Sequence, residues 1–218
     1  MRAAFDIGAA TARLTPGRPL LIVDADEVIL RFVDGFDRFL HGGGLFLDLS
    51  SYRLHGNVKR RQDDVPILDV EVTALLDEFR RELDSLELVD GARDALEALR
   101  PRLDIVVLTN ISPAQAVARQ RNLAGLGLDL PLVANSGLKG PAVKALAARA
   151  GRPVFFVDDI PQNLASAAEE APEIWRIHLI GDDRLKPLLP AAAQAHLRAD
   201  DWAEAHRFID KKLSEAGL

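Results

Sequence analysis

The chain has 218 residues, of which 48% are hydrophobic, and it carries a net charge of −6 with no cysteine. This length and hydrophobic content suffice for one sizeable α/β domain, or for a core domain with a small insertion. The absence of cysteine excludes disulfides, thiolate zinc sites and cysteine nucleophiles, and the acidic balance argues against nucleic acid as a main partner. The sequence shows neither a secretory signal nor an apolar run long enough for a membrane span, so we expect a cytoplasmic protein without a membrane partner.

The first predicted strand is the apolar run Leu21 to Val23, which leads directly into Asp24 and, two residues on, Asp26. A short apolar run of this kind is typical of a buried strand in a parallel sheet, and ligands of such sheets bind beyond the carboxyl ends of the strands. Alternation along an extended backbone points Asp24 and Asp26 the same way. Two like charges held close together repel each other, and a hard divalent cation such as Mg²⁺ relieves that repulsion.

The segment from about residue 30 to 88 differs in composition from the rest of the chain. It holds three consecutive glycines at 42–44, a basic stretch at 59–61 and a predicted helix from about 68 to 86. We interpret residues 31–88 as a small, mainly helical cap domain inserted after the first strand, and we assign no structure to residues 1–19. The apolar residues at helical spacing in the predicted helix are Val72, Leu75, Leu76, Phe79, Leu83 and Leu86.

After residue 90, apolar strands alternate with amphipathic helices. This alternation is typical of a doubly wound parallel sheet. Together with the first strand, it predicts an α/β core domain made of residues 1–30 and 89–218. The predicted strands are Ile105–Leu108, Pro131–Ala134, Val154–Val157 and Arg176–Ile180, and the predicted helices begin near Ala92, Ser112, Pro141, Pro161 and residue 201.

Polar residues follow three of the predicted strands, and two lysines lie at the start of a helix between the later ones. Because the carboxyl ends of parallel strands meet at one edge of a sheet, we expect these groups to converge at a single site. The set comprises Asp24, Asp26, Thr109, Asn110, Lys139, Lys144, Asp158 and Asp159.

The order and context of these residues resemble the four signature motifs of the haloacid dehalogenase (HAD) superfamily of hydrolases. The motifs are DxD after a first strand, Thr after a second, Lys near a helix start and DD after a later strand, and the resemblance covers residues from about 20 to 180. It implies a Rossmann-like HAD core with a cap, and a Mg²⁺-dependent phosphohydrolase. An acid at Asp26 favours phosphoryl transfer, since the dehalogenases proper lack one at this position and dispense with the metal.

The resemblance also implies how the acidic residues act. Asp24 attacks phosphorus and forms an aspartyl phosphate, while Asp26 protonates the leaving oxygen and then activates water. Asp26 must hold a proton when substrate arrives, which requires a raised pKa. The metal ligands are Asp24, Asp26 through its backbone carbonyl, Asp158 and Asp159.

By the same resemblance, Thr109, Asn110 and a lysine bind the transferring phosphoryl group. We favour Lys139 over Lys144 because Gly140-Pro141 follows it, close to the Lys-Pro pairing that is usual at this helix start. The cap is expected to limit access to a small phosphorylated metabolite, and its basic residues Arg53 and Lys59 are expected to contact the anionic substrate.

The sequence leaves three alternative functions open. A phosphomutase uses the same residues as a phosphatase. A phosphoryl-accepting signalling receiver also places acidic residues, Thr and Lys at strand ends, but its acceptor Asp follows a middle strand, where this chain has Thr109 and Asn110. A non-catalytic phosphate-binding protein on the same fold is the third, and it is kept open by Glu27, which stands where the resembled family usually has Gly.

Overall fold

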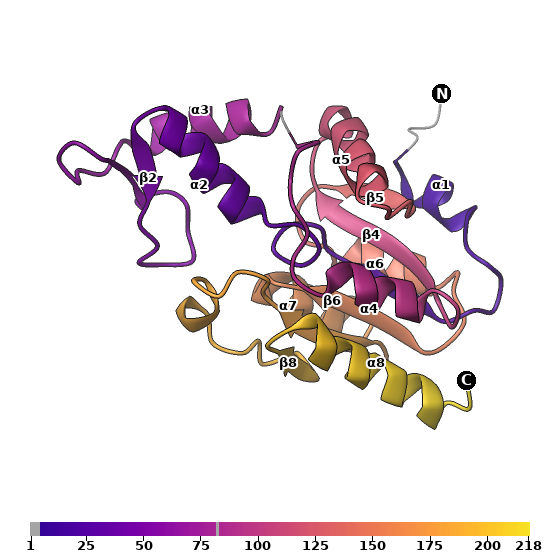
Figure 1. The fold of residues 1–218 in the computed structure, drawn as a ribbon. Coiled ribbons are helices and arrows are strands. Elements are labelled where there is room, and N and C mark those ends of the chain that lie inside the picture. Colours follow the sequence, from indigo (N-terminus) through magenta and orange to yellow (C-terminus); the bar gives the residue numbers. More distant parts are fainter. Residues whose placement is uncertain (1–4, 82) are drawn as a thin grey trace.

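The computed structural model describes residues 5–81 and 83–218. Its core is a six-stranded, all-parallel sheet in the order β5-β4-β1-β6-β7-β8 (Figure 1), which confirms the predicted α/β class. The strands are β1 (Leu20–Val23), β4 (Asp104–Asn110), β5 (Leu132–Asn135), β6 (Val154–Asp158), β7 (Trp175–Leu179) and β8 (Leu197–Ala199).

Helices cover both faces of this sheet, because alternate residues of its buried strands point to opposite sides. Leu21 and Val23 of β1 belong to the larger apolar cluster, whereas Leu20 and Ile22 belong to a second cluster on the other face. Helices α4 (Ala92–Leu99), α5 (Pro113–Gly125) and α8 (Trp202–Glu215) contribute buried residues to the first cluster, and α1 (Ile7–Thr11), α6 (Gly140–Ala147) and α7 (Pro161–Glu170) contribute to the second.

The central strand β1 pairs with β4 on one side and β6 on the other. Val23 is in register with Val107 and Val157, so the chain leaves all three strands at the same edge of the sheet. The amide of Asp24 still donates to the carbonyl of Val157 at 3.0 Å, which holds the first residue after β1 against β6.

The inserted segment contains α2 (Phe32–Gly42), a two-stranded antiparallel sheet of β2 (Leu45–Leu47) and β3 (Val58–Arg60), and α3 (Asp69–Phe79). Figure 1 shows these elements grouped beside the six-stranded sheet. The expected helices are therefore present, although neither α2 nor the hairpin was located from the sequence. The proposed limits of the cap, residues 31 and 88, stay a prediction.

The helix predicted from 68 to 86 is wrong in its length, because α3 ends at Phe79. The Phe79 ring packs within 5.6 Å of the rings of Phe32, Phe36 and Phe39, which anchors the end of α3 on α2. Beyond it the chain turns back toward the core. Leu86 is buried outside any helix, against α2 at Gly35, where a Cβ would lie 2.5 Å from the Leu86 side chain.

The remaining differences are short elements. Helix α1 lies within residues 1–19, for which no structure was predicted. The Asp6 side chain caps this helix by accepting from the amide of Ala9 at 2.7 Å. Strand β8 was not predicted, because it has only three residues and one pairing partner, β7. Helix α6 begins at Gly140, one residue before the predicted start at Pro141. Within residues 5–81 and 83–218, no helix combines the length and the apolar character that crossing a bilayer requires.

Candidate active site

Three carboxylates gather where β1 and β6 end. One oxygen from each of Asp24, Asp158 and Asp159 lies within 4.8 Å of the others, and all three residues are buried. Asp24 follows β1 and Asp158 closes the neighbouring β6, so adjacent parallel strands bring together residues distant in the sequence. The convergence expected for these positions is therefore present in the structure.

Lys139 is the basic group of this cluster. Its Nζ lies 2.7 Å from Asp24 Oδ1 and 2.8 Å from Asp158 Oδ2, and the residue is almost fully buried. Burial alone lowers the pKa of Lys139, but the two carboxylates outweigh it and raise that pKa above its ordinary value. Lys144 instead lies exposed on α6, where it pairs with Glu170 at 3.0 Å. The geometry therefore brings Lys139, and not Lys144, to the acidic cluster.

The close approach of α6 to α7 places Lys139 at the N-terminus of α6. At Gly140, the first residue of that helix, a Cβ would lie 2.3 Å from the carbonyl oxygen of Ser166 in α7. A side chain at this position would push the two helices apart, and with them the lysine. The close packing of α6 against α7 thus explains why a glycine follows Lys139 in the sequence.

Asp158 is held by two donors from the start of α7. The amide of Ile160 donates to Asp158 Oδ1 at 2.8 Å, and Asn163 Nδ2 donates to the same oxygen at 3.0 Å. Asn163 was not among the residues predicted for the site. Its signal was the spacing: Pro161 starts a helix immediately after the acidic pair, so a polar residue in the first turn faces back toward Asp158.

The donor set of this cluster fits a hard cation. Three ionised carboxylates with one ammonium group would leave a local charge of about −2 in a buried site, which is costly unless a cation neutralises it. Burial raises the pKa of Asp158, and burial together with the Asp158 carboxylate raises that of Asp159. Oxygen ligands of this kind suit Mg²⁺ and not a soft metal ion.

Asp26 lies beside the cluster without joining its three carboxylates. Its Oδ1 is 2.6 Å from Nη2 of Arg119, a buried residue of α5 that was not among the predicted site residues. Burial raises the pKa of Asp26, the Arg119 guanidinium opposes that rise, and the nearby Asp24 carboxylate adds to it, so the pKa lies above its ordinary value. A carboxyl group that retains a proton more readily is what the predicted acid role requires.

A cavity of about 240 Å³ opens over these residues, and the core and the inserted segment share its wall. Of the predicted substrate-binding residues, Thr109, Asn110, Lys139 and Arg53 line it. Lys59 is not part of the wall and pairs with Asp48 on the hairpin at 2.5 Å. From the inserted segment, the wall includes Phe32, Val33, Leu49, Tyr52, Arg53, Leu54 and Arg80.

Tyr52 connects the inserted segment to the acidic cluster. It is the only tyrosine of the chain, and its hydroxyl donates a hydrogen bond to Asp159 Oδ2. Burial and the Asp159 carboxylate raise the pKa of Tyr52, so the hydroxyl keeps its proton for this bond. Nothing in the local sequence around Tyr52 indicates that contact, because the two residues are brought together only by the way the insertion folds over the sheet edge.

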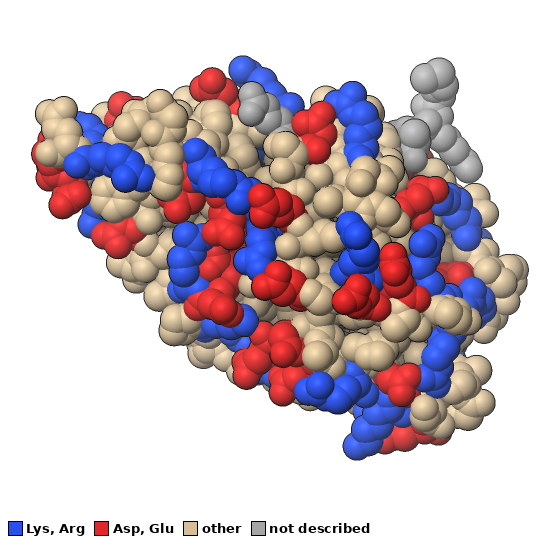
Figure 2. Space-filling view, viewed as in Figure 1, with Lys and Arg blue, Asp and Glu red and all other residues tan. Residues whose placement is uncertain are grey.

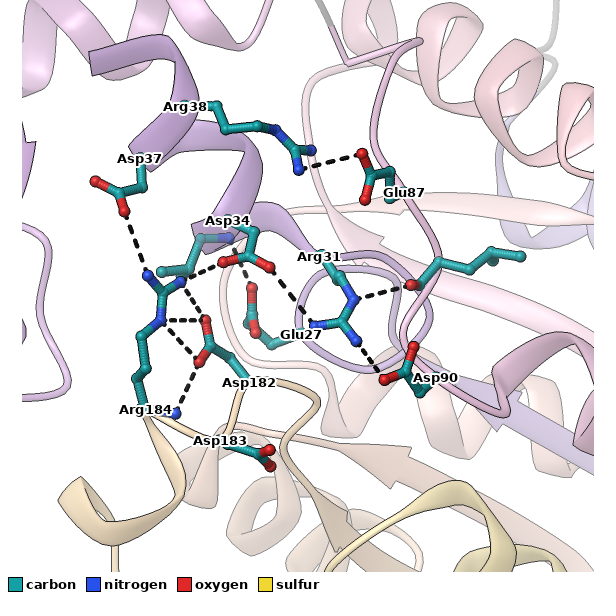
Figure 3. Close-up of polar contacts among 12 residues, drawn as sticks. Glu27, Arg31, Asp34, Asp37, Arg38, Glu87, Asp90, Asp182, Asp183 and Arg184 are labelled. Carbon is teal, nitrogen blue, oxygen red and sulfur yellow. Dashed lines mark hydrogen bonds and ion pairs between the residues drawn. The ribbon is translucent and has the colours of Figure 1, made fainter. Parts of the chain in front are cut away.

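Glu27 lies at the junction between β1 and the inserted segment. It adopts a φ of 58°, a left-handed conformation that favours glycine, and its Oε1 accepts from the amide of Val33 in the first turn of α2 at 2.7 Å. Burial is the main cause that raises its pKa to about 8. Figure 3 shows Glu27 among charged residues of α2 and of the loop after β7, including Asp34, Asp182 and Arg184.

Comparisons with known proteins agree with this fold. The chain matches no family model and no curated protein. It is similar to the structure of a haloacid dehalogenase-like protein of unknown function from Agrobacterium tumefaciens, with 15% identity and a TM-score of 0.61 over 89% of this chain and 99% of that one.

Two further structures carry bound ions. A HAD family hydrolase from Deinococcus radiodurans, with bound phosphate and sodium, has 19% identity and a TM-score of 0.58 over 91% of this chain and 97% of that one. The HAD hydrolase YfnB from Bacillus subtilis, bound to magnesium, has 15% identity and a TM-score of 0.56 over 88% and 99% of the two chains. This protein therefore has the fold of the haloacid dehalogenase-like hydrolases, with a buried acidic cluster at the carboxyl edge of its sheet.

Proposed function

We propose that this protein is a Mg²⁺-dependent phosphohydrolase that acts on a small phosphorylated metabolite. The observation that carries the proposal is the buried triad of carboxylates at the sheet edge, with Lys139 bonded to two of them, open to a cavity. The Deinococcus radiodurans neighbour with phosphate and the Bacillus subtilis neighbour with magnesium support the ligand and the metal.

The proposed reaction has two steps. An oxygen of Asp24 bonds to phosphorus while the ester oxygen leaves and takes the proton of Asp26. Asp26, now ionised, removes a proton from water as that water attacks phosphorus, which releases inorganic phosphate and restores Asp24. Thr109, Asn110 and Lys139 hold the phosphoryl oxygens in both steps.

Asp24, Asp158, Asp159 and the backbone carbonyl of Asp26 would hold Mg²⁺. When bound, the ion neutralises the repulsion between the substrate phosphate and the carboxylates. The proposal includes the division of the chain into a core of residues 1–30 and 89–218 and a cap of residues 31–88. Arg53 and Arg80 in the cavity wall suit an anionic substrate.

Release of inorganic phosphate from a panel of phosphate esters, with Mg²⁺ and with EDTA, tests this function. We expect many turnovers per protein molecule with Mg²⁺, and a fall of about 1,000-fold or more in Asp24→Asn. Asp129→Asn is the matched control, because Asp129 is 73% exposed and precedes β5 at the opposite edge of the sheet. Equal rates for Asp24→Asn and the parent would contradict the assignment of Asp24.

The same experiment separates the alternatives. A receiver would become phosphorylated once and stop, and a binding protein would release no phosphate. A phosphomutase would convert a sugar phosphate into its isomer and release little inorganic phosphate, so the products of each active ester are identified as well.

A further inference from the structure

Arg119 is a buried charged side chain near the site that the proposed reaction does not yet use. It is fully buried on α5, on the helix face that carries the buried residues Ala116 and Leu123. Within the part of the chain that the structure describes, its Nε and Nη1 have no hydrogen-bond partner, and its Nη2 pairs with Asp26. An apolar side chain of similar length would suit this helix face better.

A charge in such a place is costly. Moving a guanidinium out of water costs several kcal/mol, and that cost is offset only by a well-placed opposite charge. The ionised form of Asp26 supplies that charge through Oδ1, which lies 2.6 Å from Nη2, so the burial of Arg119 is tied to that one carboxyl group. Any effect of Arg119 on the site is therefore transmitted through Asp26.

The two oxygens of Asp26 have different surroundings. Oδ1, on the Arg119 side, is buried, yet the Asp26 side chain as a whole is 29% exposed and lines the cavity. The exposed part of the carboxyl group therefore faces the cavity while the buried oxygen faces Arg119. The contact with Arg119 therefore determines which oxygen of Asp26 faces a bound substrate.

We infer that Arg119 is a positioning residue for the reaction, which anchors Oδ1 of Asp26 and leaves Oδ2 to hand its proton to the leaving oxygen. This inference rests on the proposed function, because it assigns to Asp26 the acid role. It adds a residue from α5 that is not among the residues lining the cavity and whose ion pair, within the described residues, is with Asp26 and not with the three clustered carboxylates.

The leaving group provides the test. In the first step a basic alkoxide cannot leave without a proton, whereas p-nitrophenolate leaves unprotonated, so loss of a positioned acid slows that step only for the first kind of ester. The value of kcat/KM reports this step, because the water attack that uses Asp26 as a base comes after the alcohol has left. A defect in folding or in phosphate binding slows both kinds alike. The ratio of the kcat/KM values for glycerol phosphate and p-nitrophenyl phosphate therefore reports on Asp26 as an acid and not on general damage.

We expect Arg119→Met to lower kcat/KM for glycerol phosphate by about 100-fold and kcat/KM for p-nitrophenyl phosphate by less than about threefold. Arg119→Lys keeps the charge and should recover part of the loss. Arg121→Met is the matched control on the same helix, because Arg121 is 66% exposed and pairs with Asp84. It should match the parent on both esters.

Equal losses on the two esters, with an active parent, would overturn the role of Arg119 and leave the proposed function intact. A parent that hydrolyses no ester of the panel with Mg²⁺ would overturn both. If the parent hydrolyses another alkyl phosphate of the panel and not glycerol phosphate, that ester replaces glycerol phosphate in the comparison. If Arg119→Met does not fold, Arg119→Lys decides the matter, since the inference requires a selective loss on glycerol phosphate there too, and an unchanged ratio would overturn it.

Discussion

At the scale of single residues, the two partners of the Arg119–Asp26 ion pair differ in how much stability their removal costs. Arg119 is fully buried, whereas Asp26 is 29% exposed and can be hydrated from the cavity. Removing the Asp26 carboxylate leaves the buried Arg119 guanidinium without an opposite charge. Removing the Arg119 guanidinium leaves the Asp26 carboxylate, which water in the cavity can still hydrate. The stability of the pair therefore depends mostly on which partner is lost.

We predict that Asp26→Asn lowers the free energy of unfolding by about 3 kcal/mol and that Arg119→Met lowers it by less, about 1 kcal/mol. The double variant Asp26→Asn/Arg119→Met should recover most of the loss, because no charge remains buried. Urea unfolding of the four proteins measures this coupling. Additive losses would show that the two side chains do not compensate each other.

Glu27 shows how one residue can depart from a family pattern and still fit the fold. The left-handed backbone costs an L-residue roughly 1–2 kcal/mol. The carboxyl group offsets this cost by accepting from the amide of Val33, one of the otherwise unpaired donors in the first turn of α2. The Glu27 side chain thus links the loop after β1 to the start of the inserted segment.

At the scale of elements, β7 supports the loop that carries the acidic pair. His178 on β7 accepts from the amide of Ala192 at Nδ1, 3.1 Å away, so its Nε2 carries the proton and donates to the carbonyl of Asp159 at 2.9 Å. Burial and the neighbouring Arg198 lower the pKa of His178 to about 4. The neutral imidazole is therefore a structural link between β7 and the end of β6.

The sign of the pH effect follows from this lowered pKa. Unfolded His178 takes up a proton below about pH 6.5, whereas folded His178 resists until about pH 4. The parent should therefore lose stability relative to His178→Asn as the pH falls from 6.5 to 4, by up to roughly 3 kcal/mol, with no further change below or above this window. Parallel urea unfolding of both proteins across the window measures it, and a constant difference would contradict the link.

At the scale of the whole molecule, ion pairs join α2 to the core. Arg184, in the loop after β7, lies 2.5 Å from Asp34 and 3.3 Å from Asp37 on α2, and 2.5 Å from Asp182 in its own loop. Arg31 and Arg38 pair with Asp90 and Glu87 at the other junction of the inserted segment (Figure 3). Figure 2 shows acidic and basic side chains intermixed over this face.

We predict that Arg184→Ala loosens the inserted segment more than it weakens the fold. The pairs are partly exposed, so the loss in global stability should stay below about 1 kcal/mol. Hydrogen exchange of α2 and of the hairpin should nevertheless accelerate several-fold, and high salt should produce the same effect in the parent. Arg152→Ala is the control, because Arg152 forms an exposed pair with Glu173 away from α2. Equal exchange in all three proteins would contradict a linking role for Arg184.

Much of the architecture could be predicted from the sequence, because apolar periodicity is a local signal. The runs before Asp24, Thr109 and Asp158 mark buried strands, and their order along the chain implies one shared sheet edge. Boundaries were less certain where burial comes from distant partners. Phe79 ends α3 against α2, and Leu86 is buried outside a helix although it continues the helical spacing.

The amino-acid sequence by itself determined the α/β class, the acidic residues of the candidate site and their gathering at one edge, since strand order and residue type carry that information. Only the tertiary structure decided between Lys139 and Lys144, and only it brought Tyr52 to Asp159 and Arg119 to Asp26. These contacts join elements far apart in the chain, and a side chain's partner there depends on how helices and the inserted segment pack over the sheet, which no local pattern records.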